Sequence, residues 1–231
     1  QSGCIGNVIG FESINPESIK TMRKAPNLLG KNNQGQKRLE GWDRYQQQVE
    51  ILRDHHLQTW ASFTLGHDGD TPESIKETRD FAISNKFCFA AFNILMPYPN
   101  TPLYDRLESE DRLLYDGRWW THPEYRFNHA AFTPKNMSPE ELTQACWDCR
   151  YEWNRPMSVF KRSLDFKTHM SSLSRFLLYW TYNPIYAKEN FKKQSMHFGK
   201  DKANKTKVHT AQVGEKPTAP QEQLMWKMPA V

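Results

Sequence analysis

The chain has 231 residues, 38% of them hydrophobic, and a formal net charge of +5. This length is enough for a domain with its own core, and the mild basic excess is too scattered to predict nucleic-acid binding. The sequence contains neither an apolar run of the length that a membrane helix needs nor a secretory leader, so we expect no transmembrane segment. Four scattered cysteines argue against a secreted disulfide framework, so we expect a cytoplasmic location.

A repeated pattern organises the first hundred residues. The sequence Pro-Glu-Ser-Ile-Lys occurs at 16–20 and again at 72–76, each time after a short apolar run that ends in glycine, Gly10 or Gly66. Each copy follows a good helix N-cap and therefore predicts a strand, a glycine-bearing loop and a helix. Phe89 to Leu95 predicts a third strand. Strands that alternate with helices favour an α/β fold with a parallel sheet, in which ligands gather at the C-terminal ends of the strands.

Three regions follow from the pattern along the chain. Residues 1–110 hold the strand and helix units and end in a proline-rich exit loop. Residues 111–187 are rich in aromatic side chains, and a capping-box signature at Ser138 to Glu141 predicts a helix there. From Lys188 onward lysines replace apolar periodicity, so residues 188–231 predict a disordered basic tail.

Four segments of the chain together carry a family resemblance. They are Gly10-Phe11-Glu12-Ser13 with Met22-Arg23-Lys24, Ser62 to Ser74, Ala91 to Leu107, and Thr133 to Leu142. In this order and spacing they resemble radical S-adenosylmethionine (radical SAM) enzymes of the cobalamin-binding branch. The first three are similar to the fourth, fifth and sixth barrel strands of that family, and the last to the segment after the barrel. The resemblance implies the C-terminal part of a TIM-like (β/α) barrel, strands four to six, followed by a mostly helical region.

The same resemblance implies an activity and its cofactors. Enzymes of this family cleave S-adenosylmethionine at a [4Fe-4S] cluster to a 5′-deoxyadenosyl radical, and the cobalamin branch most often methylates a substrate carbon. Ring formation and rearrangement also occur in that branch. The C-x3-C-x2-C loop that binds the cluster does not occur in this chain. The resemblance therefore places the cluster and the cobalamin domain in a missing N-terminal half, without which we expect the chain to be inactive. The aromatic residues at 111–187 suit either a helical lid or a pocket for a lipid-like or other small-molecule substrate.

Five residues are candidates for cofactor binding: Glu12, Lys24, Ser62, Gly66 and Asn93, of which Glu12 and Lys24 match ligand-binding positions of the family. A carboxylate at Glu12 can accept hydrogen bonds from two ribose hydroxyls, and Lys24 can pair with the methionine carboxylate. Ser62 would offer a hydroxyl, Gly66 would allow close approach of a ligand, and Asn93 lies near the end of strand six. Simpler structural interpretations stay open, with Glu12 and Lys24 as helix-end charges and Gly66 as a turn residue.

Two other functions also stay open. One is a radical SAM enzyme without cobalamin, such as a methylthiotransferase or a coproporphyrinogen-oxidase-like protein. The other is a non-catalytic binding module that keeps the half-barrel. Cys146-Trp147-Asp148-Cys149 has the C-x2-C spacing of metal sites, but no second pair follows it. We therefore predict no metal site within this chain.

Overall fold

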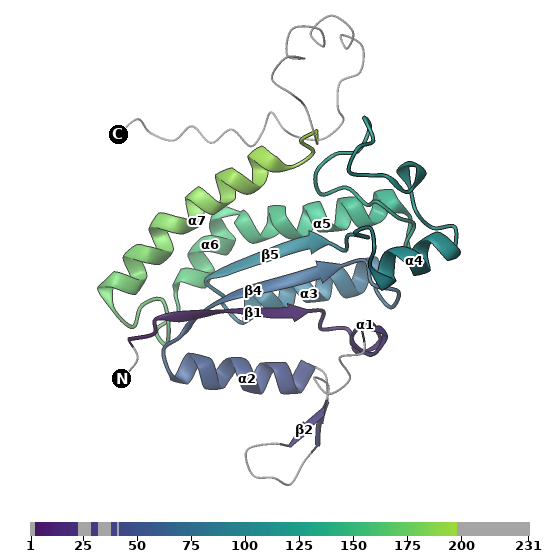
Figure 1. Cartoon of the computed structure of the whole chain (residues 1–231). Helices are drawn as coiled ribbons and strands as arrows, with labels where there is room; N and C mark the ends of the chain where they lie inside the picture. The colour runs from purple at the N-terminus through teal and green to yellow at the C-terminus, as the bar shows by residue number, and fades with distance from the viewer. Residues whose placement is uncertain (1–2, 23–28, 32–37, 41, 198–231) are drawn as a thin grey trace, which may run out of the picture. The chain divides into compact units, whose positions relative to one another are not determined.

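The computed structural model describes residues 3–22, 29–31, 38–40 and 42–197 (Figure 1). Its centre is a parallel sheet with the strand order β1 (Gly6–Glu12), β4 (Gln58–Leu65) and β5 (Phe89–Ile94). A separate antiparallel pair consists of β2 (Leu29–Lys31) and β3 (Arg38–Glu40). The predicted α/β class is confirmed. The assignment of the sheet to a barrel stays a prediction.

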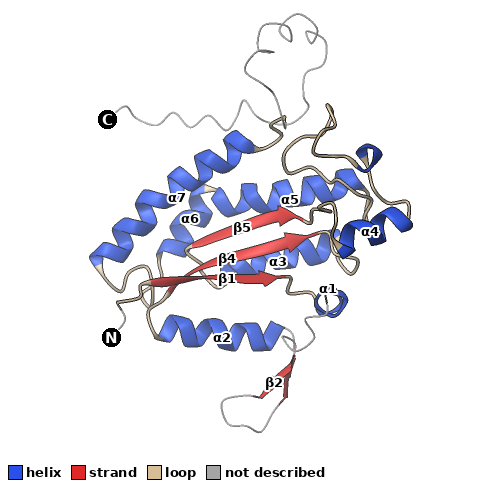
Figure 2. Ribbon diagram, in the orientation of Figure 1, coloured by secondary structure: helices blue, strands red, loops and turns tan. Residues whose placement is uncertain are grey.

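Seven helices accompany the sheet in the described ranges (Figure 2). They are α1 (Pro16–Thr21), α2 (Trp42–Asp54), α3 (Pro72–Ser84), α4 (Pro102–Ser109), α5 (Pro139–Asn154), α6 (Pro156–Ser163) and α7 (Leu173–Lys193). The repeated pattern explains how the first and third begin, because Asn15 caps α1, Thr71 caps α3, and a proline follows each cap. None of the helices in these ranges is long and apolar enough to cross a membrane.

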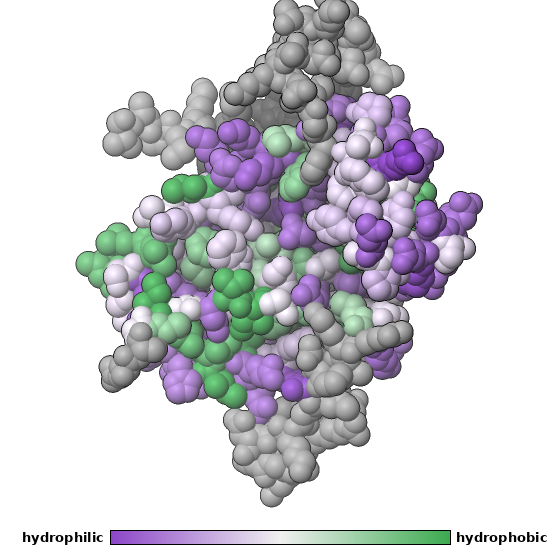
Figure 3. Space-filling view, viewed as in Figure 1, coloured by the Kyte–Doolittle hydropathy of each residue, from purple (hydrophilic) through white to green (hydrophobic). Residues whose placement is uncertain are grey.

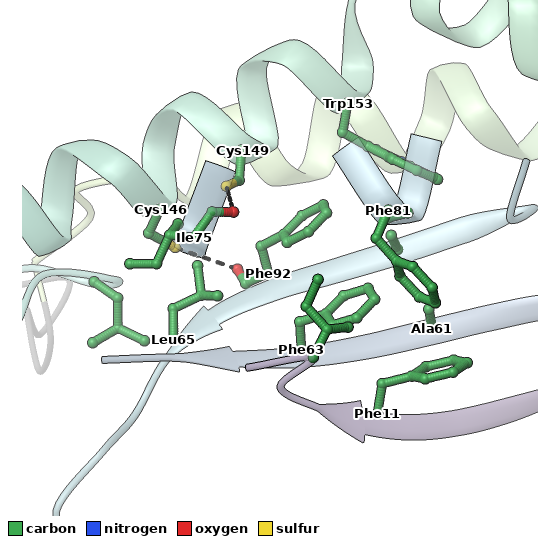
Figure 4. Packing of buried hydrophobic residues seen from close by; sticks show 14 of the residues in the cluster. Phe11, Ala61, Phe63, Leu65, Ile75, Phe81, Phe92, Cys146, Cys149 and Trp153 are labelled. Carbon is green, nitrogen blue, oxygen red and sulfur yellow. Dashed lines mark hydrogen bonds between the residues drawn. The ribbon is translucent and has the colours of Figure 1, made fainter. Parts of the chain in front are cut away.

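The sheet has one covered face and one open face. Along β4, Ala61, Phe63 and Leu65 alternate into the core, where the Phe63 ring stacks between those of Phe11 and Phe92 at centroid distances of 5.6 and 5.4 Å. Side chains of α5 complete this core from the helical side (Figure 4). The opposite face carries the alternate residues, and on it the side chain of Val8 is 72% exposed. A ligand can therefore approach the sheet from this second face.

The two edges of the sheet differ. Alternate carbonyls along the outer edge of β5 accept side-chain hydrogen bonds: Cys88 from Asn183 (3.4 Å), Ala90 from Tyr186 (3.0 Å) and Phe92 from Arg150 (2.7 Å). Asn183 and Tyr186 belong to α7, and Arg150 belongs to α5. These side chains occupy the positions where another strand would bond, so β5 is the last strand on its side.

The helical region differs in two respects from its sequence pattern. Helix α7 continues to Lys193, beyond the predicted tail boundary at Lys188, because Phe191 still packs on the Trp147 ring of α5 at 5.6 Å. In addition, α5 packs on α3 and β5 and shares their core, although it follows the predicted boundary at residue 110. The rest of the predicted tail, residues 198–231, lies outside the described residues.

Candidate functional site

A cavity of about 820 Å³ lies at the C-terminal ends of the three parallel strands. Its walls come from β1, the end of α1, β4 and the loop after it, and the segment from β5 into α4. The lining residues are Glu12, Thr21, Met22, Thr64, His67, Asp68, Leu95, Pro102, Leu103 and Arg106. This volume is within the range of small-molecule sites, about 300–1,000 Å³. The cavity is at the edge of the sheet where the topology predicts a ligand.

Glu12 is fixed at the mouth of this cavity by an irregularity in β1. The pairing register with β4 shifts between Gly10 and Glu12, and Glu12 has a positive φ of 63°. Such a backbone is unfavourable for a residue with a side chain, and bulges of this kind redirect side chains next to functional sites. The Thr64 hydroxyl donates to the Glu12 carboxylate at 2.8 Å. A Cβ on Gly10 would lie 2.9 Å from a Glu12 carboxylate oxygen, so glycine at that position leaves room for this placement.

Gly66 allows the backbone of the loop after β4 to adopt its conformation. Its φ is 100°, and a Cβ there would lie 2.6 Å from the side chain of Leu142. The Asp70 carboxylate accepts hydrogen bonds from the amides of Gly66 and His67 at 2.9 and 3.0 Å, and also one from the Ser18 hydroxyl. Gly66 is not among the residues that line the cavity. These contacts explain the glycine without a ligand, and a cofactor-binding role for it stays a prediction.

Ser62 and Asn93 lie on the open face of the sheet but outside the cavity lining. Ser62 precedes Thr64 by two residues and shares its face, whereas Asn93 pairs with Thr64 in register. The Asn93 side-chain oxygen accepts a hydrogen bond from Arg150 at 2.8 Å. The structure therefore groups Glu12, Ser62 and Asn93 on one face, around Thr64. Lys24 lies outside the described residues.

Asp68 has the same offset from its glycine as Glu12 but a different environment. Arg106 contacts its carboxylate, and Arg112 and Lys135 lie 3.1 and 3.2 Å from it. Burial raises the pKa of Asp68, but these three basic groups outweigh burial and lower the pKa to about 2. The carboxylate is thus held in an ion-pair network, through which Arg106 is anchored at the cavity wall.

Sequence reasoning missed most of the cavity wall. Arg106 gave one signal that could have been used, because it follows the exit loop by a single helical turn and therefore lies near the strand ends. Thr21 and Leu103 carry no such pattern. They reach the cavity through the packing of α1 and α4, which the sequence pattern does not specify.

The Cys146 and Cys149 pair belongs to the hydrophobic core. Both thiols lie on the buried face of α5 (Figure 4), where they donate to the carbonyls of Phe92 and Ile75 at 3.5 and 3.7 Å. Burial raises the pKa of both thiols, which disfavours the thiolate form that binds metals. Across the part of the chain that the structure describes, no three His, Cys, Asp or Glu side chains form a metal-binding group.

The cavity combines a fixed carboxylate, two hydroxyl-bearing side chains and apolar walls. A carboxylate held in this way can accept hydrogen bonds from vicinal hydroxyls, such as those of a ribose ring. The apolar side chains of Met22, Leu95 and Leu103 suit the body of a nucleoside or another largely apolar ligand. These features fit S-adenosylmethionine as a ligand.

Comparison with known proteins places the chain beside two carbon-methylating enzymes. No family model matches it. It is 31% identical over 162 residues to bacteriochlorophyllide d C-12(1)-methyltransferase of Chlorobaculum tepidum, across 70% of this chain and 31% of that enzyme. It is 26% identical over 155 residues to hopanoid C-2 methylase of Rhodopseudomonas palustris, across 67% of this chain and 25% of that enzyme. The chain spans less than a third of the length of each relative, and over two thirds of its own length it is similar to enzymes named for methylation of carbon.

Proposed function

We propose that this chain is the C-terminal part of a radical SAM enzyme that transfers a methyl group to a carbon of a largely apolar substrate. The observation that carries the proposal is the Glu12 carboxylate, held by Thr64 at the strand ends within a cavity of ligand size. The motif resemblance and the similarity to two carbon-methylating enzymes support the same reaction class. The motif resemblance concerns segments that include Glu12 and Thr64 of the cavity lining.

In this proposal each side chain has a limited task. Glu12 accepts hydrogen bonds from the ribose hydroxyls of S-adenosylmethionine, and Thr64 holds the carboxylate in place. Ser62 and Asn93 add further polar groups beside Thr64 on the same face of the sheet. Lys24 pairs with the methionine carboxylate. When bound, a [4Fe-4S] cluster would supply the electron that cleaves S-adenosylmethionine, and its cysteine ligands would come from a part of the whole protein outside these 231 residues. Cobalamin, as the methyl carrier, is assigned to that part as well.

The first test is the affinity of the full-length protein for S-adenosylmethionine. Replacement of Glu12 by alanine removes hydrogen bonds to a charged acceptor, which stabilise a complex by about 1.5–3 kcal/mol. We therefore expect Glu12→Ala to weaken binding about ten- to a hundredfold in a calorimetric titration. Gly10→Ala should also weaken binding, though by less, because its Cβ would lie 2.9 Å from a Glu12 carboxylate oxygen and shift the carboxylate without removing its charge.

The matched control is Glu17→Ala. Glu17 is an exposed acid on α1 that pairs with Lys20 at 2.7 Å and lines no part of the cavity. The Glu17→Ala variant should bind S-adenosylmethionine as tightly as the wild-type protein does. If Glu12→Ala keeps full affinity and normal stability, Glu12 is a helix-end acid and the proposed site is wrong.

The alternatives separate in one further experiment on the full-length protein. Formation of 5′-deoxyadenosine from S-adenosylmethionine distinguishes a radical SAM enzyme from a non-catalytic module. The cobalamin content of the purified protein distinguishes the methylating branch from a cobalamin-independent enzyme. We expect both 5′-deoxyadenosine and bound cobalamin.

A further inference from the structure

The segment from α6 to the first half of α7 presents large apolar side chains to solvent. In Figure 3, hydrophobic residues gather over the N-terminal end of α7 and the loop before it, at the left of the view. Six of them are between 41% and 76% exposed: Met157, Phe160, Leu164, Phe166, Leu173 and Leu177. We call these six residues the α6–α7 apolar face. Single exposed apolar residues are ordinary, but an exposed cluster of this kind marks an interaction site.

The apolar face is carried by a well-fixed backbone. Arg162 is buried, lies 3.4 Å above the Trp153 ring, and donates to the carbonyls of Phe87 and Trp153 at 3.1 and 2.9 Å. Tyr179 of α7 is also buried and donates to the Val159 carbonyl of α6 at 2.8 Å. These bonds join α6 to α7, to the end of α5 and to Phe87, two residues before β5. The helices that carry the apolar face are thus tightly packed against the rest of the fold. The six apolar side chains point outward from this fixed backbone.

Residues 156–187 contribute mainly basic charge around this face, although the acidic Asp54 of α2 also lies beside it. Residues 156–187 contain four basic residues and one acid, Asp165, which is 2% exposed and pairs with Arg53 at 3.0 Å. Lys161 and Lys167 are exposed, and Arg175 is half-buried at the start of α7. Lys167 lies 2.5 Å from Asp54 of α2, beside the face. Apolar side chains interspersed with basic groups are the combination that binds anionic lipid surfaces.

We propose that the α6–α7 apolar face docks on the surface of an anionic lipid bilayer. Its apolar side chains would enter the boundary between headgroups and acyl chains, and Lys161, Lys167 and Arg175 would lie among the phosphates. In this proposal the face rests on the membrane surface, and no described helix is long and apolar enough to cross a bilayer. A protein partner is less well matched, because the centres of such interfaces are depleted in lysine. This inference goes beyond the proposed methyl transfer and does not depend on it.

The test is co-sedimentation of the full-length protein with two kinds of vesicle, one of phosphatidylcholine alone and one that also contains phosphatidylglycerol. We expect binding to the anionic vesicles, with a preference over the neutral ones that disappears at high salt. The double variant Phe166→Ser, Leu173→Ser should bind about tenfold more weakly or worse, because two highly exposed apolar groups are lost. Lys161→Glu with Lys167→Glu should remove the preference for anionic vesicles.

Two control variants carry the same chemical changes elsewhere. Tyr98→Ser removes an exposed apolar group from the loop before α4, and Lys76→Glu reverses an exposed charge on α3. Both controls should bind vesicles as the wild-type protein does. Melting curves and light scattering on every variant report folding and oligomeric state.

Three results would overturn the proposal. One is absence of wild-type binding to either vesicle. A second is equal binding by the wild-type protein and the Phe166→Ser, Leu173→Ser variant. The third is unchanged vesicle binding by that variant together with a changed oligomeric mass or a lower melting temperature. A changed mass would assign the face to a second copy, and a lower melting temperature would assign it to the rest of the protein.

Discussion

Asp68 illustrates how a single side chain can organise one wall of the cavity. Its carboxylate joins α4, through Arg106, to two residues that come later in the chain, Arg112 and Lys135. Arg106 lines the cavity and depends on Asp68 for its position. Loss of this one carboxylate would leave three basic groups without their shared partner.

We expect Asp68→Asn to lower the free energy of unfolding by about 1–2 kcal/mol near neutral pH. This figure is smaller than for a fully buried ion pair, because Arg106 and Lys135 are nearly half exposed and solvent screens their charges. The folded pKa of about 2 is below the ordinary 3.8, so the stabilisation is fully present above about pH 4 and is lost as the pH falls through 2. Urea unfolding across this range measures the difference. Asp80→Asn, at an exposed ion pair, is the control. A difference that persists unchanged at the acid end would contradict the explanation.

The sequence predicted individual residues only where the information is local. Asparagine tolerates left-handed backbone geometry better than most residues, and Asn100, in the exit loop after β5, has a φ of 61°. In contrast, Glu12 and Asp68 have the same offset from a glycine, yet one faces the cavity beside Thr64 and the other is paired with three cations. The partners of Asp68 are separated from it by many residues, so no local pattern could distinguish the two acids.

At the scale of elements, the connection between α6 and α7 is fastened to the sheet by His169. The ring is fully buried, lies 2.8 Å from the Lys86 carbonyl through Nε2, and has Nδ1 3.1 Å from the Gln58 amide nitrogen. This network makes Nε2 the donor and Nδ1 the acceptor, so the ring is neutral. A proton on Nδ1 would face another donor.

Acid should therefore loosen this connection. Burial is the main cause that lowers the pKa of His169, to about 4, although the Lys86 carbonyl opposes it. The histidine has its ordinary pKa of 6.5 in the unfolded chain and a pKa of about 4 in the folded chain, so between these pH values the unfolded chain binds the proton more readily. The contribution of neutral His169 to the free energy of unfolding is therefore fully present above this window and is lost as the pH falls through it. In His169→Gln the fall between about pH 7 and pH 4 should be smaller in urea unfolding, whereas His122→Gln should behave as the wild type. An unchanged slope in His169→Gln would refute this assignment.

The existence of most elements could be predicted, but their ends and contacts could not. Caps and prolines at Asn15, Thr71 and Ser138 are local signals, and the helices begin where these signals predict. The end of α7 depends on Phe191 meeting Trp147, which lies 44 residues earlier in the sequence. The bulge that places Glu12 depends on pairing between β1 and β4, which the residues of β1 alone do not specify.

For the molecule as a whole, the chemical reactivity of the cysteines can report how often the core unfolds. Cys4 is exposed, whereas Cys88, Cys146 and Cys149 are buried between the sheet and the helices. Burial raises the pKa of the Cys88 thiol to about 12 and raises those of the other two buried thiols. The core must separate before these three thiols can react.

We expect alkylation of the native protein to modify Cys4 rapidly and the three buried cysteines only at the rate of global unfolding. Mass-spectrometric mapping of each cysteine, with and without urea, measures this difference. Cys146 and Cys149 should react together, because they share one face of α5 (Figure 4). Fast modification of Cys149 in the absence of urea would mean that α5 separates from the sheet on its own.

The sealed edge of β5 gives protein engineers a rule for lengthening this sheet. A strand added beside β5 would have to displace the side chains of Asn183, Tyr186 and Arg150 from the carbonyls that they occupy. Within the described residues β1 pairs only with β4, so its other edge offers backbone groups for a new partner. A complementing fragment or fused strand should therefore be designed to lie beside β1, and the sheet can be extended in one direction only.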